Sequence, residues 1–164
     1  INVETKIGKG TRIKIILPFE EVKVKAQEIQ KNVNNERLIK ELKIISAEDV
    51  EINQKFLELL LKNKCVLFKK VYNGNELLKE LEKEKYDLIL MDIQMPEMNG
   101  IDVTKLIKGN KRYKEIPIIA VSAYALEENV KEMYDAGIDD FISKPIKKEE
   151  LIEKINKLVE TKNV

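Results

Sequence analysis

The chain has 164 residues, enough for one domain of ordinary size with an appendage, and its 30 Lys and Arg against 29 Asp and Glu give a net charge of +1. Such a balanced surface lacks the basic field that nucleic-acid binding requires, and no apolar run approaches the roughly 18 residues of a membrane helix. There is no signal-peptide pattern, the single cysteine cannot form an internal disulfide, and the absence of histidine excludes histidine-dependent catalysis and histidine metal sites. We therefore expect a cytoplasmic chain that contacts neither nucleic acid nor a membrane.

The first 18 residues predict an antiparallel hairpin. Gly8-Lys9-Gly10 forms the turn, apolar Ile13, Ile15 and Leu17 mostly alternate with polar residues, and Pro18 ends the second strand. Because an isolated hairpin is marginally stable in water, we expect these apolar side chains to pack on the rest of the chain or on a second copy, giving a homo-oligomer. Residues 19–41 are charged and contain neither Gly nor Pro, which favours a partly helical linker.

From residue 42 onward the sequence alternates between strand and helix patterns. Five short apolar runs predict strands at Lys43–Ala47, Val66–Val71, Leu88–Asp92, Ile116–Ser122 and Phe141–Ser143. The intervening segments predict helices that turn the following apolar residues inward: Ile52, Phe56, Leu59 and Leu60; Leu77, Leu78 and Leu81; Val103, Leu106 and Ile107; Leu126, Val130, Met133 and Tyr134; and Leu151, Ile155, Leu158 and Val159.

This alternation predicts an α/β fold, a five-stranded parallel sheet doubly wound by helices on both faces. Lys69 and Lys70 interrupt the second strand, and lysines suit an edge, where they discourage unwanted pairing. An edge-like second strand and a buried third strand favour the order 2-1-3-4-5 of flavodoxin-like sheets.

Chemically suggestive side chains stand at the carboxyl ends of four of the five predicted strands. Glu48-Asp49 follow the first strand, Asp92 ends the third, Ser122 ends the fourth and Lys144 follows the fifth. Parallel strands end at the same edge of a sheet, so we expect these side chains to lie together. Three converging carboxylates need a cation, and oxygen ligands suit Mg²⁺, while a lysine and a hydroxyl suit a phosphoryl group. Since a carboxylate that attacks phosphorus gives an acyl phosphate, the residues alone suggest phosphorylation of Asp92.

Four sequence motifs stand in order at these strand ends. They are Glu48-Asp49, MDIQMPEMNG with Asp92, AVSA with Ser122, and DDFISKP with Lys144. With these motifs, residues 42–160 resemble the receiver domain of two-component response regulators, most closely the receivers fused to hybrid histidine kinases. The resemblance implies that the domain accepts a phosphoryl group from a phosphohistidine onto Asp92 and then changes a partner-binding surface around the fourth and fifth strands and the last helix. The partner would be a histidine kinase core or a histidine phosphotransfer protein.

The resemblance also implies a role for each residue of the site. Asp49 and Asp92 would bind Mg²⁺ together with the backbone carbonyl of Gln94, and Glu48 would act directly or through water. Lys144 would pair with Asp92 or with the phosphoryl group. Ser122, where many relatives have Thr, would form a hydrogen bond to a phosphoryl oxygen.

Further expectations concern the surroundings of the site. Phe141 matches the aromatic switch position, which turns inward when the strand-end hydroxyl moves toward the phosphate, and as Phe it would switch by packing alone. The Lys144-Pro145 peptide is typically cis in relatives. Gln94 and Tyr124 fall at positions that tune the lifetime of the phosphoryl group.

Three alternatives belong to other classes. A phosphatase with an aspartyl-phosphate intermediate usually has a second Asp two residues after the nucleophile, where this chain has Gln94. A pseudo-receiver would be an interaction module that is never phosphorylated; the intact acidic residues and Lys144 argue against it, and it remains the alternative reading. A nucleotide-binding α/β domain is disfavoured because no G-x-G-x-x-G or Walker sequence follows the first strand.

The segment GKGTRIKIILP has a glycine turn, a Thr and an alternating strand that ends in Leu-Pro. It resembles the closing turn and last strand of a histidine-kinase ATP-binding domain. The resemblance implies that residues 1–18 are a remnant of that domain, 19–41 a linker and 42–162 the receiver. The chain, which begins with Ile1, would be the C-terminal part of a hybrid histidine kinase. The ATP site and the phosphorylated histidine would lie upstream, so this chain would not be a kinase on its own.

Overall fold

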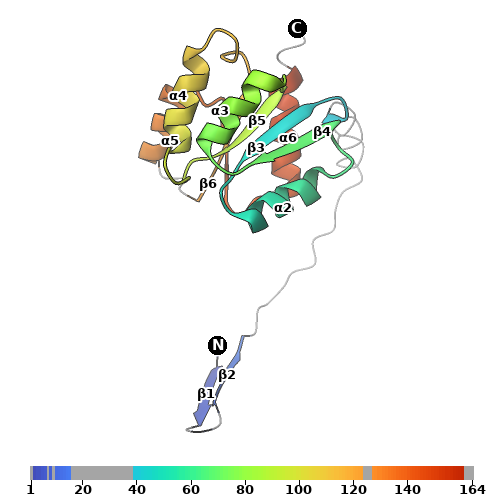
Figure 1. Cartoon of the computed structure of the whole chain (residues 1–164). Coiled ribbons are helices and arrows are strands. Elements are labelled where there is room, and N and C mark those ends of the chain that lie inside the picture. Colours follow the sequence, from blue (N-terminus) through green and yellow to red (C-terminus); the bar gives the residue numbers. More distant parts are fainter. Residues whose placement is uncertain (1, 7, 9, 16–38, 124–126, 161–164) are drawn as a thin grey trace. The chain divides into compact units, whose positions relative to one another are not determined.

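The computed structural model describes residues 2–6, 8, 10–15, 39–123 and 127–160. The chain divides into two units, one within residues 1–30 and the other within residues 31–164. In the first unit, β1 (Asn2–Lys6) pairs antiparallel with β2 (Gly10–Lys14), and Val3 stands opposite Ile13 (Figure 1). This pairing confirms the predicted hairpin, whose apolar Val3, Ile13 and Ile15 are exposed. Leu17, Pro18 and residues 19–38 of the predicted linker lie outside the described residues.

The second unit is built on the predicted parallel sheet. Its strands are β3 (Lys43–Ala47), β4 (Leu67–Val71), β5 (Leu88–Asp92), β6 (Ile118–Ser122) and β7 (Asp140–Ser143). Their order is β4-β3-β5-β6-β7 and all neighbours are parallel, which confirms the predicted order (Figure 1). All five residues of the central strand β5 are buried, whereas only the last residue of the edge strand β4 is. Neighbouring helices on both faces explain why β5 is continuously apolar up to its final residue.

Helices cover both faces of this sheet. They are α2 (Glu51–Leu61), α3 (Gly74–Lys83), α4 (Gly100–Gly109), α5 (Glu127–Asp135) and α6 (Lys148–Glu160). Because successive strand residues point to opposite faces, the strands supply two separate core clusters. Ile89 of β5 packs in the cluster that contains buried residues of α3, α4 and α5, while Leu88 and Leu90 pack in the cluster that contains those of α2 and α6. Within the described residues, no helix is both long enough and apolar enough to cross a bilayer.

The face of α2 that packs on the sheet differs from the predicted one. Ile52 and Leu59 are 69% and 67% exposed, and the residues buried against the sheet are Gln54, Leu57 and Leu61. The helix carries two apolar stripes, and helical periodicity alone does not decide between them. Burying Gln54 allows its amide to reach backbone carbonyls at the ends of β3 and β4, which selects the Leu57 stripe.

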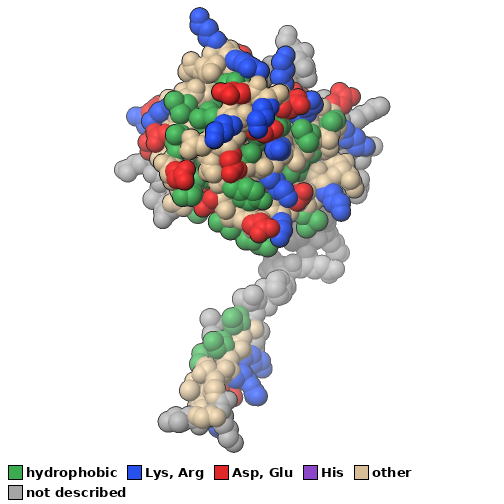
Figure 2. Space-filling model, viewed as in Figure 1, with side chains coloured by type: hydrophobic (Ala, Val, Ile, Leu, Met, Phe, Trp, Pro, Cys, Tyr) green, Lys and Arg blue, Asp and Glu red, His purple; other side chains and the backbone are tan. Residues whose placement is uncertain are grey.

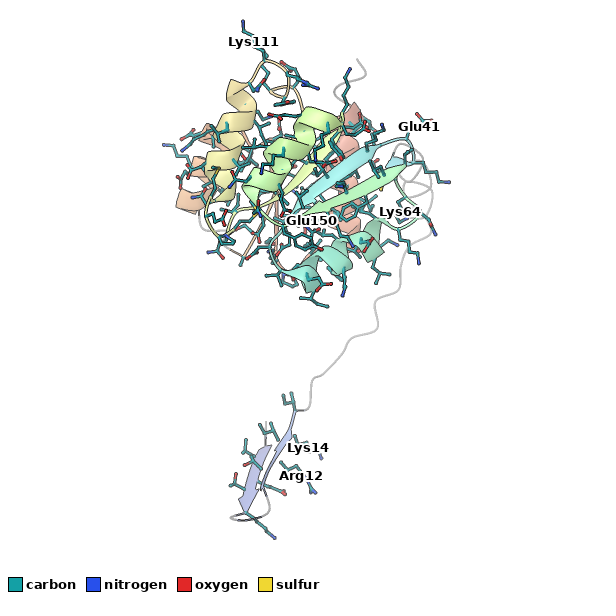
Figure 3. All side chains as sticks on the ribbon, in the orientation of Figure 1. Arg12, Lys14, Glu41, Lys64, Lys111 and Glu150 are labelled. Carbon is teal, nitrogen blue, oxygen red and sulfur yellow. The ribbon has the colours of Figure 1, made fainter. Side chains whose placement is uncertain are left out.

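Two other residues predicted to point inward also lie on the surface. Leu106 of α4 is 52% exposed and Tyr134 of α5 is 48% exposed, while Leu126 lies outside the described residues. Apolar side chains are visible at the lower part of the second unit in Figure 2, where Figure 1 places α2. Charged side chains of both signs surround them, and Glu41 and Lys111 extend outward from the periphery (Figure 3).

Candidate functional site

Asp92 is the last residue of β5 and lies at the carboxyl edge of the sheet. Its side chain is 5% exposed, and the backbone N–H of Gln94 donates a hydrogen bond of 3.1 Å to Asp92 Oδ1. The loop then returns tightly to α4, which Asn99 caps by accepting hydrogen bonds from two backbone N–H groups. A Cβ atom on Gly100 would fall on the carbonyl oxygen of Asp92, so only glycine allows α4 to begin this close to the end of β5.

Lys144 connects Asp92 with the acidic residue that follows β3. Its Nζ donates hydrogen bonds of 2.8 Å to Asp92 Oδ2 and of 2.8 Å to Glu48 Oε2. Its backbone N–H donates to the carbonyl of Ser122 at 2.8 Å, which ties the end of β7 to the end of β6. The Lys144-Pro145 peptide is cis, as the resemblance to receiver domains implies.

Three carboxylates converge at this edge, as expected from their positions after β3 and β5. Glu48, Asp49 and Asp92 each present an oxygen atom within 4.8 Å of the others; Glu48 and Asp92 are buried and Asp49 is half-buried. The ammonium of Lys144 offsets one of these three negative charges through its two salt bridges. An all-oxygen donor set with excess negative charge fits a hard divalent cation such as Mg²⁺.

The electrostatics of the site follow from this crowding. Burial raises the pKa of the Asp92 carboxyl, and repulsion from Glu48 adds to the rise, while the hydrogen bonds from Lys144 and from the Gln94 N–H oppose it. Burial lowers the pKa of Lys144, but its bonds to Asp92 and Glu48 outweigh burial, so the net pKa of the ammonium is raised. Lys144 therefore stays charged at neutral pH, and a further cation would relieve the cost of ionising Asp92.

Ser122 ends β6, directly after the residue that pairs with Asp92, and Phe141 lies on the adjacent strand β7, two residues before the partner of Ser122. Ser122 is 2% exposed and lines a pocket of about 250 Å³ together with Gln94 and Met133. Phe141 is half-buried; its ring makes an edge contact with Tyr134, 6.5 Å between centroids, and the Nζ of Lys154 on α6 lies 5.5 Å from its centroid. The ring therefore connects β7 to α5 and α6.

Two residues that the sequence reasoning missed also contact the site. Asn53 and Gln54, both in the first half of α2, donate hydrogen bonds to the Glu48 side chain and to the Glu48 carbonyl, respectively. Polar residues on a surface helix normally face water, so residue type alone gave no signal for them. The sequence feature that could have pointed to them is their position within six residues of the acidic pair Glu48-Asp49.

Comparison of the sequence with known protein families identifies the family of this chain. The response regulator receiver domain family matches residues 44–156. The chain belongs to this family. The receiver of two-component signalling was therefore predicted correctly from the four strand-end motifs.

Relatives of this receiver include separate regulators and sensor kinases. The polar-differentiation response regulator DivK of Brucella anthropi is 37% identical over 112 residues, which cover 68% of this chain and 91% of DivK. The autoinducer 2 sensor kinase/phosphatase LuxQ of Vibrio vulnificus is 32% identical over 152 residues, which cover 92% of this chain but only 18% of LuxQ. This chain thus spans most of DivK but a small part of LuxQ.

Solved structures agree with the receiver fold. The receiver domain of sensor histidine kinase PA1611 from Pseudomonas aeruginosa PAO1 is 29% identical, with a TM-score of 0.67, and covers 73% of this chain and 98% of that one. It is described with a magnesium ion coordinated in its active-site cleft. The receiver domain of a signal transduction histidine kinase from Syntrophus aciditrophicus is also 29% identical, with a TM-score of 0.68, over 73% of this chain and 91% of that one.

The structure brings most of the predicted site residues together. Glu48, Asp49, Asp92 and Lys144 lie within one hydrogen-bonded and acidic cluster. The Gln94 contact to Asp92 runs through its N–H, and the role predicted for its carbonyl stays a prediction, as do the roles of Ser122 and Phe141. Tyr124 lies outside the described residues.

Proposed function

We propose that this receiver accepts a phosphoryl group from a phosphohistidine onto Asp92. The observation that carries the proposal is the Asp92 carboxylate at the end of the central strand, 2.8 Å from the Lys144 ammonium. In the step, an Asp92 oxygen attacks phosphorus, a P–O bond forms, and the P–N bond of the donor breaks. The donor imidazole keeps the electron pair and takes a proton from water. Lys144 offsets the negative charge of both the carboxylate and the incoming phosphoryl oxygens.

Mg²⁺ is the proposed cofactor of this step. Glu48, Asp49 and Asp92 would hold it, with the backbone carbonyl of Gln94 as a further ligand, and their crowded oxygens support this assignment. The ion would supply positive charge against the carboxylates and the phosphoryl oxygens. The residues of the chain fit this role because Glu48 and Asp92 share the ammonium of Lys144, and the neighbouring Asp49 adds a third negative charge.

The donor and the parent protein are also proposals. The LuxQ match runs over 152 residues and so reaches beyond residues 44–156, which supports the C-terminal part of a hybrid histidine kinase as the source of this chain. Residues 1–18 would then be the end of the kinase ATP-binding domain, 19–41 a linker and 42–162 a receiver located in the cytoplasm. A kinase core or a histidine phosphotransfer protein would supply the phosphoryl group.

The proposed output is a change in the surface formed by β6, β7 and α6. Ser122 at the end of β6 would bind a phosphoryl oxygen, and Phe141 on β7 would turn inward to follow it. The contact of the Phe141 ring with Lys154 supports a link between this ring and α6. Phosphorylation would then favour one of two conformations of this surface.

The test is the intact mass of the chain after incubation with Mg²⁺ and acetyl phosphate. We expect the native chain to gain the mass of one phosphoryl group and Asp92→Asn to gain none. Hydroxylamine should remove the added group, because it cleaves acyl phosphates but not phosphate esters. A second incubation with a phosphorylated kinase core then tests the histidine donor. If the native chain binds Mg²⁺ but gains no mass from either donor, the pseudo-receiver reading replaces this one.

A further inference from the structure

Asn53 of α2 and Lys144 contact different oxygens of the Glu48 carboxylate. Its Nδ2 donates a hydrogen bond of 2.7 Å to Glu48 Oε1, while Glu48 Oε2 accepts the hydrogen bond of 2.8 Å from Lys144. Glu48 is 1% exposed, so these donors replace most of its contact with water. The backbone N–H of Val50 makes a longer hydrogen bond of 3.4 Å to Oε1. Two neutral donors on Oε1, of which Asn53 is the closer, and one charged donor on Oε2 therefore fix the orientation of this carboxylate.

Gln54, the next residue along α2, holds the backbone on both sides of Glu48. It is fully buried, and its Nε2 lies 3.0 Å from the Ser46 carbonyl, 3.2 Å from the Glu48 carbonyl and 2.8 Å from the Val71 carbonyl. The same Val71 carbonyl accepts the N–H of Glu48 at 3.2 Å. The chain is thus tied to the end of β4 at the point where it leaves β3.

The two contacts of Glu48 differ in what happens when a cation binds. An incoming cation competes with the Lys144 ammonium for Glu48 Oε2, because both are positive and both need the same oxygen atoms. The Asn53 amide is neutral and donates to the other oxygen, Oε1, where its bond of 2.7 Å is shorter than the 3.4 Å bond from the Val50 N–H. Asn53 therefore keeps the carboxylate turned toward Asp49 and Asp92 whether or not Lys144 remains bound to it.

We propose that Asn53 is a positioning residue for the cation that this site binds, and that Gln54 supports it by fixing the backbone of Glu48. The inference rests on the proposed function, since it takes the cation to be the Mg²⁺ used in phosphoryl transfer. Donors that orient metal-binding side chains typically change metal affinity by about 10- to 100-fold when they are removed. Because Mg²⁺ keeps several waters and Glu48 is one of several ligands, we expect the lower end, about tenfold.

The experiment compares Mg²⁺ binding by the full chain, by Asn53→Ala and by Asn75→Ala, using isothermal titration calorimetry. Asn75 is exposed at the start of α3, and its side chain donates a long hydrogen bond of 3.4 Å to Glu97, so it controls for the same substitution in another helix. Because alanine is the best helix former, we expect both variants to fold, which thermal melts would check. We expect the dissociation constant for Mg²⁺ to rise about tenfold for Asn53→Ala and to stay unchanged for Asn75→Ala.

A second readout separates positioning from a general loss of structure. In phosphoryl uptake from acetyl phosphate, Asn53→Ala should need about tenfold more Mg²⁺ for half-maximal rate and reach the native rate at saturating Mg²⁺. A site that is merely disordered would lose rate at saturation as well. That result, or a dissociation constant within about twofold of native, overturns the proposal.

The two proposals fail in different ways. If the native chain binds Mg²⁺ but gains no phosphoryl group, the proposed function fails and the calorimetric comparison still decides the role of Asn53. If phosphoryl uptake is normal and Asn53→Ala binds Mg²⁺ like the native chain, only the positioning role fails. A native chain that does not bind Mg²⁺ overturns the positioning role directly.

Discussion

Replacing Lys144 with Met is the most direct test of how the acidic site is held together. Methionine keeps most of the length and apolar volume of lysine but removes the ammonium that contacts Glu48 and Asp92 at 2.8 Å each. The two carboxylates are 1% and 5% exposed, so they would face one another with little water to separate their charges. We therefore expect Lys144→Met to destabilise the receiver when no divalent cation is present.

The magnitude follows from the burial of the three groups. Removing one partner of a buried ion pair costs about 3 to 5 kcal/mol of unfolding free energy. The Lys144 side chain is 25% exposed, so water already screens part of this interaction, and we expect about 2 to 3 kcal/mol. For a folded unit of about 120 residues, that corresponds to a melting temperature lower by roughly 10 °C.

Thermal melts with a chelator measure this loss, and Lys70→Met is the matched control. The Lys70 side chain is 28% exposed, close to the value for Lys144, but its partner Glu58 is 48% exposed. Exposed pairs contribute little, so Lys70→Met should leave the melting temperature nearly unchanged. Added Mg²⁺ should raise the melting temperature of Lys144→Met more than that of the native chain, because the variant site carries one more negative charge.

Two outcomes would refute this reasoning. A melting temperature of Lys144→Met within about 2 °C of native in chelator would mean that the two carboxylates do not depend on the ammonium. Equal effects of Lys144→Met and Lys70→Met would mean that burial of the partner carboxylates does not matter.

Three other predictions test the packing around the site and the surface electrostatics. Leu57→Ala should lower the unfolding free energy in urea by about 2 to 5 kcal/mol because Leu57 is buried, whereas exposed Leu59→Ala should change it by about 0.5 kcal/mol or less; equal losses would contradict the orientation of α2. Gly100→Ala should lower it by about 1 to 3 kcal/mol, since its Cβ would meet the backbone at the end of β5, and a variant as stable as native would contradict this close approach. The hydrogen bond from Lys43 holds the pKa of the Glu84 carboxyl below its ordinary value of 4.5, so ionised Glu84 favours the folded chain. The advantage of the native chain over Lys43→Met should therefore be present above that value and disappear in strongly acidic solution, which melts across pH would show; a pH-independent difference would argue against it.

The strands and their order could be predicted because the sequence marks both. Each strand is a short apolar run, and the lysines of β4 identify an edge strand. The orientation of α2 could not be predicted, since Ile52 and Leu59 on one stripe are as apolar as Leu57 and Leu61 on the other. The choice between the stripes depends on Gln54, whose acceptors are backbone carbonyls of β3 and β4. Such acceptors exist at every residue, so no residue type reveals which of them will be used.

The site residues could be predicted from the sequence where they stand at the ends of predicted strands. Asp92 and Lys144 stand at strand ends, and parallel topology alone brings those ends together. Asn53 lies on a helix, where a polar side chain is expected to face water, and only the folded structure shows that its amide turns back to Glu48. The sequence thus predicts the charged groups of this site better than the neutral groups that orient them.

The ion pairs of Lys144 also have a consequence for how the protein is made. Lys144 is 96 residues from Glu48 and 52 residues from Asp92 along the chain. A polypeptide still emerging from the ribosome therefore carries the acidic residues of β3 and β5 before the lysine after β7 exists to pair with them. Contacts between such distant segments form late, because closing long loops costs entropy that only the finished sheet offsets. A nascent chain thus lacks the ion pairs of Lys144 with Glu48 and Asp92 until its last strand has docked. Under the proposed function, phosphoryl uptake would then also report that synthesis and folding of the receiver are complete.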